Sequence, residues 1–242
     1  MSLILGIDLE TSGLDPKKDR IVELGAVLYD WELQIPVQMI SKIIDPAMEN
    51  GEFKISEESE ELTGISDHML GKYGAYEKDV LVELQGLSQF ADYRMGHFCN
   101  DFDALFMIES YARTAVEEPS LTWLDTSIDI RYPEHIKTRN LKHLAAEHGF
   151  LNPFPHRAVF DVLTMLRIAS CYKLEDIIAR SKEPTVYVQA LVSFEEKDFA
   201  KDRGYRWCAP RKIWWRSWKL SDYEADKMEC GFRTQLLPEA PE

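Results

Sequence analysis

Long apolar runs and clustered cysteines are both missing from this 242-residue sequence. No stretch approaches the ~20 apolar residues needed to cross a bilayer, and no lipid-anchor motif is present. The four cysteines, Cys99, Cys171, Cys208 and Cys230, form no CxxC pair and are too far apart for a zinc finger. No signal-peptide pattern precedes the first strand-like run. We therefore expect a cytoplasmic protein in a reducing compartment, without a membrane anchor.

Basic residues are also scarce. Lys and Arg total 28 against 42 Asp and Glu, and the net charge of -14 argues against duplex binding through phosphate contacts. Residues 197–219 are the exception, because this window contains eight basic and two acidic residues. Hydrophobic residues make up 45% of the chain and charged residues 29%, which is typical of a folded protein with a sizeable core.

The periodicity of the first 175 residues or so predicts an α/β fold. Three consecutive strands, expected to be antiparallel neighbours, lie at 3–7, 20–30 and 36–45. Helices are then expected at 56–62, 66–70, 77–91, 103–113, 140–148 and 157–173, with further strand-like segments at 94–98 and 122–126. Ser56 and Ser66 are the expected N-caps of the first two helices.

The character of the chain changes near residue 180. The segment ARSKEPT, residues 179–185, is polar and contains Pro184, which is typical of a linker. Beyond it we expect a small α+β unit with strands at 186–192 and 212–218, a helix around 195–203 and a short helix from Ser221. Four of the six tryptophans lie in this part.

Two acids follow the first strand within the segment LILGIDLETSGL, residues 3–14. Side chains two apart on a strand share a face, so Asp8 and Glu10 can reach one point. Burying two like charges together is costly unless a cation compensates, and a divalent metal does so directly. The alternative is that the strand simply ends in solvent. Gly13 in the following TSGL permits the backbone to bend close to whatever the acids bind.

A second acid lies in GHFCNDFDALFM, residues 96–107, where an apolar strand passes into a helix. Asp103 and Asp101 compete for this position, and Phe102 before Asp103 favours Asp103. Either acid can also be explained as a helix N-cap.

The third candidate segment is NPFPHRAVFDVLTML, residues 152–166. Pro153 and Pro155 keep the approach extended, so His156 is expected on the loop before the helix and Asp161 about one turn inside it. Five residues along an ideal helix are ~140° apart, so the two side chains would not share a face if both were helical.

These segments together resemble the DEDDh (DnaQ-like) family of 3′-to-5′ exonucleases, which includes the proofreading subunit of bacterial DNA polymerase III and RNase T. The resemblance rests on GIDLETSGL, DRIVELGAV, ELTGISDHML, FDALFM and HRAVFD, in the family's order over about residues 3–173. It implies an RNase H-like fold, with a mixed five-stranded sheet flanked by helices in a domain over residues 1–178. A small, basic, tryptophan-rich α+β domain over 185–242 would follow it.

The resemblance also implies roles for particular residues. The metal ligands would be Asp8, Glu10, Asp103 and Asp161, holding two divalent cations, Mg²⁺ or Mn²⁺. His156 would be the general base. Thr11, Leu14 and Phe102 would lie near the terminal nucleotide of the substrate.

The implied activity is hydrolysis of single-stranded nucleic acid, preferably DNA, from a free 3′ end, with release of nucleoside 5′-monophosphates. Two alternatives remain open: an exoribonuclease or oligoribonuclease acting on RNA ends, and a catalytically silent nucleic-acid-binding protein that retains the fold.

The basic window over residues 197–219 combines cations with aromatic residues, a composition that proteins use to bind single-stranded nucleic acid. The competing explanation is that a unit of this size needs aromatics for its own core. In a strand, Trp214 and Trp218 would share one face and Trp215 would take the other.

Overall fold

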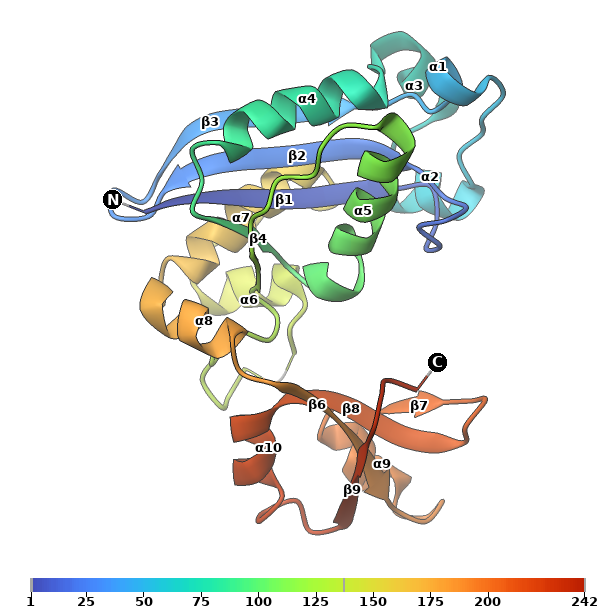
Figure 1. Cartoon of the computed structure of the whole chain (residues 1–242). Coiled ribbons are helices and arrows are strands. Elements are labelled where there is room, and N and C mark those ends of the chain that lie inside the picture. The colour runs from blue at the N-terminus through green and yellow to red at the C-terminus, as the bar shows by residue number, and fades with distance from the viewer. Residues whose placement is uncertain (1, 137, 242) are drawn as a thin grey trace. The chain divides into compact units, whose positions relative to one another are not determined.

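The computed structural model describes residues 2–136 and 138–241 of the chain (Figure 1). These residues fall into two units with the boundary between Ser181 and Lys182, here called the N-terminal and C-terminal units. No helix in the described residues is long and apolar enough to cross a membrane.

A mixed five-stranded sheet forms the centre of the N-terminal unit, as predicted. Its strand order is β3-β2-β1-β4-β5. The strands are β1 (Leu3–Thr11), β2 (Ile21–Asp30), β3 (Ile35–Ile43), β4 (Tyr93–Gly96) and β5 (Trp123–Asp125). β2 pairs antiparallel with both β1 and β3, whereas β4 runs parallel to β1 and β5 parallel to β4. The three consecutive antiparallel strands expected from the sequence are therefore confirmed.

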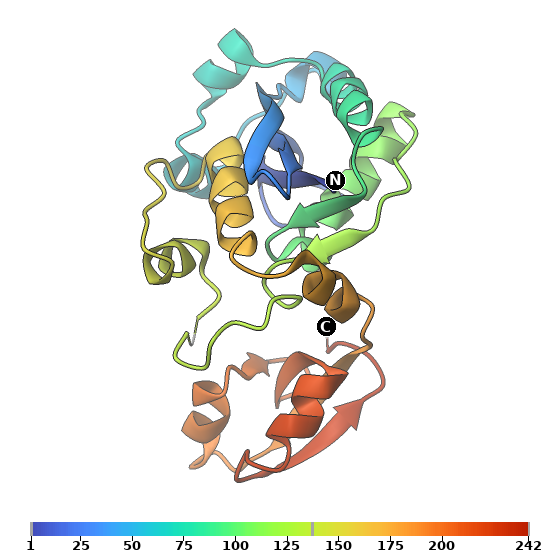
Figure 2. The ribbon, with the colours of Figure 1, turned by 90° about the vertical axis from the view of Figure 1, so that its left-hand side faces the viewer.

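Helices cover both faces of this sheet, which explains why most residues of its central strands are apolar. The helices are α1 (Ala47–Asn50), α2 (Glu57–Thr63), α3 (Asp67–Tyr73), α4 (Glu77–Ser88), α5 (Asp103–Thr114), α6 (Leu141–Glu147), α7 (Ala158–Ala169) and α8 (Leu174–Ser181), with a 3-10 turn η1 (Cys99–Asp101). Figure 2 shows α7 on one side of the sheet and α4 on the other. Side chains of β1 alternate between two core clusters, one shared with α7 and one with α4 and α5.

The predicted N-caps are confirmed. The Ser56 side chain accepts a hydrogen bond from the Ser59 N–H, and the Ser66 side chain accepts one from the Met69 N–H. Each bond satisfies a backbone donor that the first helical turn leaves without a partner.

The sequence prediction was wrong for residues 170–173, expected to be helical, and for residues 179–181, expected to be a linker. The helix expected over 157–173 ends at Ala169, and a separate helix, α8, occupies residues 174–181. Leu174 and Ile177 of α8 are buried in the core shared with α7, and Arg180 Nε donates to the Ile128 carbonyl at 2.8 Å. The first residues of the expected linker therefore belong to a packed helix.

Helix α7 approaches the sheet most closely at two glycines. A Cβ on Gly25 of β2 would lie 2.3 Å from the Val159 nitrogen, and one on Gly6 of β1 would lie 2.7 Å from a Val162 methyl carbon. Only residues without side chains allow this approach, which brings the first turns of α7 over the end of β1.

The C-terminal unit is α+β, as expected. Its antiparallel sheet has the order β7-β8-β6-β9. The elements are β6 (Thr185–Leu191), α9 (Lys197–Asp202), β7 (Arg206–Cys208), β8 (Ile213–Lys219), α10 (Leu220–Asp226) and β9 (Arg233–Leu237). Strands β7 and β9 were not predicted, because they are short and carry few apolar residues. Trp214 and Trp218 both pack on the core of this unit, as the strand alternation predicted.

Candidate active site

Asp8 and Glu10 lie on one face of β1, near its C-terminal end. The intervening Leu9 points the opposite way, into the core beneath α4 and α5. The register of the sheet places Asp8 beside Gly25 and Glu10 beside Glu23, both on β2. The missing side chain at Gly25 leaves room for α7 to approach this face.

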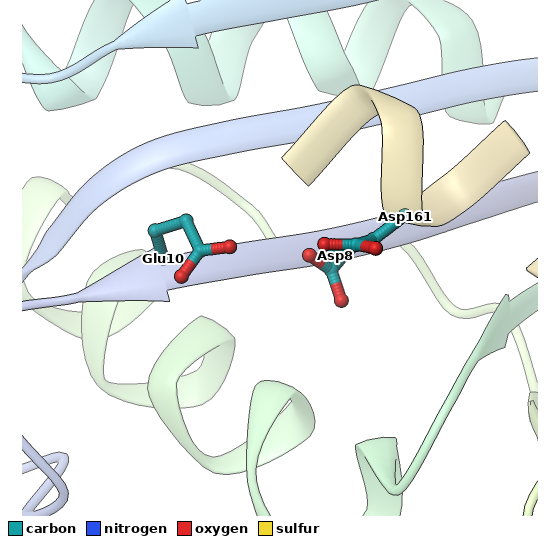
Figure 3. Close-up of side chains that lie close together, drawn as sticks. All are labelled: Asp8, Glu10 and Asp161. Atoms are coloured by element: carbon teal, nitrogen blue, oxygen red, sulfur yellow. The ribbon is translucent and has the colours of Figure 1, made fainter. Parts of the chain in front are cut away.

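Asp161, in the first turn of α7, completes a cluster with these two acids. One carboxylate oxygen from each of Asp8, Glu10 and Asp161 lies within 4.8 Å of the other two. Figure 3 shows Asp8 and Glu10 projecting from β1, with Asp161 reaching them from α7. Oxygen ligands at this spacing suit a hard divalent cation such as Mg²⁺ or Mn²⁺.

The loop before α7 is tied directly to Asp161. The His156 backbone N–H donates to Asp161 Oδ2 at 2.8 Å, and Asn152 Nδ2 donates to Asp161 Oδ1 at 2.6 Å. His156 has a positive φ of 61°, a conformation that side-chain-bearing residues adopt only when their surroundings hold it. His156 thus lies outside the helix, as predicted, and its side chain is exposed.

Asp103 is not one of the three acids that lie within 4.8 Å of one another, but its charge acts on Asp8. It is the first residue of α5 and is buried, whereas the competing Asp101 is exposed. The N-cap position itself is occupied by Phe102, whose side chain makes no capping hydrogen bond. Burial raises the pKa of the Asp103 carboxyl to about 7, against the opposing effect of hydrogen bonding to backbone N–H groups.

The acids of the site disfavour one another's ionisation. Burial raises the pKa of Asp8 well above its ordinary value, and among its charged neighbours Asp103 contributes most, followed by Glu10 and Asp161. Burial and the charge of Asp161 raise the pKa of Glu10 to about 8. Like charges gathered away from water are tolerable when a cation is bound between them, so the chemistry of this donor set fits a divalent metal.

Glu23 and Arg157 connect β2 to the start of α7. Arg157 donates to both carboxylate oxygens of Glu23, with Nη2 at 2.9 Å from Oε1 and Nε at 3.1 Å from Oε2. The Ala158 backbone N–H donates to the same carboxylate at 3.2 Å. Glu23 is 1% exposed, so this ion pair is shielded from water on its acidic side. It fixes the beginning of the helix that carries Asp161.

Asp125, at the end of β5, organises the loop that leads to Asp103. Its carboxylate accepts hydrogen bonds from the Phe98 and Asn100 backbone N–H groups at 3.0 and 3.2 Å, and from the Ser127 hydroxyl at 2.6 Å. The neighbouring His97 bonds to the Thr126 hydroxyl through Nδ1 and to the Arg139 carbonyl through Nε2. Both ring nitrogens of His97 are therefore engaged.

A cavity of about 390 Å³ opens over the acidic cluster. It is lined by Asp8, Leu9, Glu10, His97, Asn140, Leu141, Lys142, Asn152, Pro155, His156 and Asp161. Three acidic side chains, an exposed histidine and a lysine thus border one space. The acidic oxygens at this cavity can hold a divalent cation.

The three expected substrate contacts lie outside that lining. The Thr11 hydroxyl donates to the Gly13 carbonyl at 2.7 Å, within the turn that follows β1. Leu14 in that turn is 83% exposed. Phe102 is half-buried and its ring lies 4.9 Å from the Phe106 ring.

Comparison with known families decides the identity of the N-terminal unit. The family model of the RNase T exonucleases, described as "Exonuclease", matches residues 5–169. The chain belongs to this exonuclease family. The predicted resemblance to the DEDDh (DnaQ-like) exonucleases is thereby confirmed, and with it a nuclease domain acting on nucleic acid.

Relatives of this exonuclease family member include DNA polymerases. The PolC-type DNA polymerase III of Pediococcus pentosaceus is 32% identical over 156 residues, and that of Thermotoga maritima is 32% identical over 158 residues. Each alignment covers 64% of this chain and 10% of the polymerase, so the chain spans about a tenth of the relatives it matches.

Solved structures of E. coli exonuclease I share the fold. A zinc-bound complex with single-stranded DNA has a TM-score of 0.64 at 17% identity and covers 84% of this chain and 50% of that chain. A complex with a dT13 oligonucleotide has a TM-score of 0.63 at 18% identity, with 84% and 51% coverage.

Several residues around the site were not anticipated from the sequence. They are Glu23, Arg157, Asp125, Asn152, His97 and Lys142. Glu23 and Arg157 are 134 positions apart, so no local sequence pattern predicts that they form an ion pair. Asn152 could have been suspected, since an Asn directly before a proline-rich loop often hydrogen-bonds nearby backbone.

Proposed function

We propose that this chain is a metal-dependent 3′-to-5′ exonuclease that removes nucleotides from single-stranded DNA and releases nucleoside 5′-monophosphates. The observation that carries the proposal is the convergence of Asp8, Glu10 and Asp161 within 4.8 Å at the base of a cavity that His156 also lines. Membership of the exonuclease family supplies the reaction class.

Two divalent cations, Mg²⁺ or Mn²⁺, would be held by four acids, Asp8, Glu10, Asp161 and Asp103. When bound, such ions supply Lewis-acid stabilisation for the attacking and leaving oxygens of a phosphodiester. The raised pKa values of Asp8 and Glu10 support this role, because the acids repel one another when no cation compensates them.

His156 is the proposed general base. An imidazole can accept a proton from water near neutral pH, and this one is exposed at the edge of the cavity. The backbone of the same residue is anchored to Asp161, so the loop positions the ring relative to a metal ligand. Asn152 holds the other oxygen of Asp161, which fixes the carboxylate plane.

Thr11, Leu14 and Phe102 are the proposed contacts to the terminal nucleotide. The exposed Leu14 offers an apolar surface against which a base can pack. Gly13 supports this turn, because a Cβ there would lie 2.4 Å from an Asp19 carboxylate oxygen. Asp19 in turn accepts a hydrogen bond from the Asp15 N–H at 2.9 Å, which closes the loop beneath Leu14.

A single strand with a free 3′ end is the proposed substrate. The E. coli exonuclease I structures with the same fold are complexes with single-stranded DNA, which favours DNA over RNA here. The net charge of -14 also favours a substrate bound at its end over a long duplex held by phosphate contacts. We assign the activity to the cytoplasm, which suits a chain without CxxC motifs.

The test uses the full chain with oligomers of DNA and RNA labelled at the 5′ end, in Mg²⁺, in Mn²⁺ and in chelator. We expect a descending ladder on DNA that disappears with chelator and in Asp8→Ala. Glu57→Gln, which changes an acid in the first turn of α2, is the control and should retain the ladder. A ladder on RNA alone would make the protein an exoribonuclease. Binding without cleavage under every metal condition would identify a silent binding protein.

A further inference from the structure

The small sheet of the C-terminal unit has two faces. Helices α9 and α10 pack on one face, and the other face carries a different set of side chains. Val188 and Ala190 of β6 pack on Ala200 of α9 and Tyr223 of α10. Because strand side chains alternate, Tyr187 and Gln189 point to the opposite face. We call this second surface the open face.

Register extends the open face across all four strands. Trp215 of β8 pairs with Gln189 of β6 and with Arg206 of β7, and Gln189 also pairs with Gln235 of β9. Cross-strand partners share a face, so these side chains form one row. The row reads Arg206, Trp215, Gln189, Gln235, and Tyr187 flanks it 6.1 Å from the Trp215 ring.

The sheet of this unit is basic, whereas its two helices together carry more acids than bases, α9 having two of each. The four strands and the β7–β8 turn contain Arg206, Arg211, Lys212, Arg216, Lys219 and Arg233 and no acidic residue, whereas α10 carries three acids and no basic residue. Among these cations, Arg216 stacks on Trp218 and Lys219 is buried. Arg206, Arg211, Lys212 and Arg233 are exposed, and Arg206 lies 4.5 Å above the Trp215 ring.

The core of the unit does not account for the aromatic residues on the open face. Trp214, Trp218, Tyr205 and Tyr223 already fill the space between the sheet and its helices. Trp215 and Tyr187 lie on the other side and are half-buried. Aromatic rings beside an arginine and two amides present stacking, phosphate and hydrogen-bonding partners together.

We propose that the open face binds single-stranded DNA, with bases stacking on Trp215 and Tyr187, phosphates contacting Arg206 and the β7–β8 turn, and base edges meeting Gln189 and Gln235. Arg211 in that turn already pairs with a carboxylate, Glu239, at 3.2 Å. Both partners of that pair are exposed, and such pairs contribute little to stability, so a phosphate can replace the carboxylate. The choice of DNA over RNA rests on the proposed function. The inference that the open face binds a single-stranded nucleic acid does not rest on it.

The test measures fluorescence anisotropy of a labelled thymidine oligomer of about 20 nucleotides, long enough for a stacking platform, with the full chain in chelator. Trp215→Leu should weaken binding about tenfold or more, since stacking is lost. Arg206→Gln should lower the slope of log affinity against log salt by about one. Trp207→Leu is the matched control, because Trp207 is an exposed tryptophan on the same hairpin that pairs with Trp214 on the helix side.

Circular dichroism melting of each variant shows whether it folds. A second measurement uses the unaltered chain: a strand containing 5-iodouracil should cross-link to Trp215 or Tyr187 on irradiation. The proposal is overturned if Trp215→Leu binds DNA as tightly as the unaltered chain, or if Trp207→Leu loses as much affinity as Trp215→Leu. It is also overturned if cross-links fall only within residues 1–181, or if an RNA oligomer binds more tightly than the DNA oligomer. Binding through this face by a chain that cleaves nothing in Mn²⁺ would support it while refuting the proposed exonuclease activity.

Discussion

Arg157 Nη2 lies 2.9 Å from Glu23 Oε1, and this ion pair joins the second strand of the sheet to the helix that carries Asp161. Glu23 is also the register partner of Glu10. The buried Glu23 carboxylate therefore affects the site in two ways. It anchors α7, and its negative charge raises the pKa of Glu10, although burial and the charge of Asp161 have larger effects.

Arg157→Met should lower kcat roughly tenfold, because small displacements of α7 move Asp161 and His156 out of position. Arg113→Met is the matched control: Arg113 pairs with Glu77, a buried acid held at 2.7 Å between α4 and α5. Both variants lose a partner of a buried acid and should be destabilised to a similar degree. The measurements are steady-state kinetics and thermal melting. A loss of kcat in Arg113→Met as large as in Arg157→Met would show that destabilisation alone explains the effect.

Gly25→Ala should reduce activity about a hundredfold, since the new Cβ would lie 2.3 Å from the backbone nitrogen of Val159 and force α7 away from the sheet. Overpacking of this kind also costs about 1–3 kcal/mol of stability. Gly86→Ala provides the contrast, because no heavy atom lies within 4 Å of a Cβ at Gly86 in α4. It should leave activity unchanged, as measured on the labelled oligomer. If Gly25→Ala remained fully active, the close approach of α7 would not be what positions Asp161.

Stability of the metal-free protein should fall as the pH rises from about 4.5 to about 8, the interval between the ordinary pKa of Glu10 and its raised value. The folded chain holds its proton on Glu10 up to about pH 8, against an ordinary value of 4.5, and Asp103 behaves similarly with a pKa of about 7. The unfolded chain releases these protons at lower pH, so rising pH favours unfolding. Mg²⁺ should offset the loss by binding the ionised acids of the folded state.

The measurement is the unfolding midpoint in chelator and in Mg²⁺ across that pH interval. Glu10→Gln removes one of the titrating acids and should show a smaller decline in chelator. A midpoint that neither falls with pH in chelator nor rises with Mg²⁺ would argue that these acids do not share a cation site.

The order of the catalytic segments could be predicted from the sequence because each lies beside a strong local signal. Asp8 and Glu10 come directly after the apolar run over 3–7, within a strand that continues to Thr11, and His156 lies between two prolines and an apolar helix. The central strands were predictable for the same reason, since burial on both faces requires continuous apolar runs.

Other features of the fold depend on contacts between residues far apart in the sequence, so local sequence patterns do not predict them. The β9 segment, RTQLL, has little strand character alone and becomes a strand by pairing with β6. The α8 helix was taken partly for a linker because its polar face dominates the pattern, although Leu174 and Ile177 are buried. The sequence predicted Asp103 as a fourth metal ligand, and no local pattern indicated that Asp8, Glu10 and Asp161 would form the tighter group.

The central claim is that Asp8, Glu10 and Asp161 share divalent cations, and Mn²⁺ titration of the full chain followed by electron paramagnetic resonance tests it most directly. We expect two Mn²⁺ ions per chain near neutral pH, and loss of this binding in Asp8→Asn and Asp161→Asn. Glu57→Gln should bind like the unaltered chain. Equal Mn²⁺ binding by the unaltered chain and by Asp8→Asn would contradict the account.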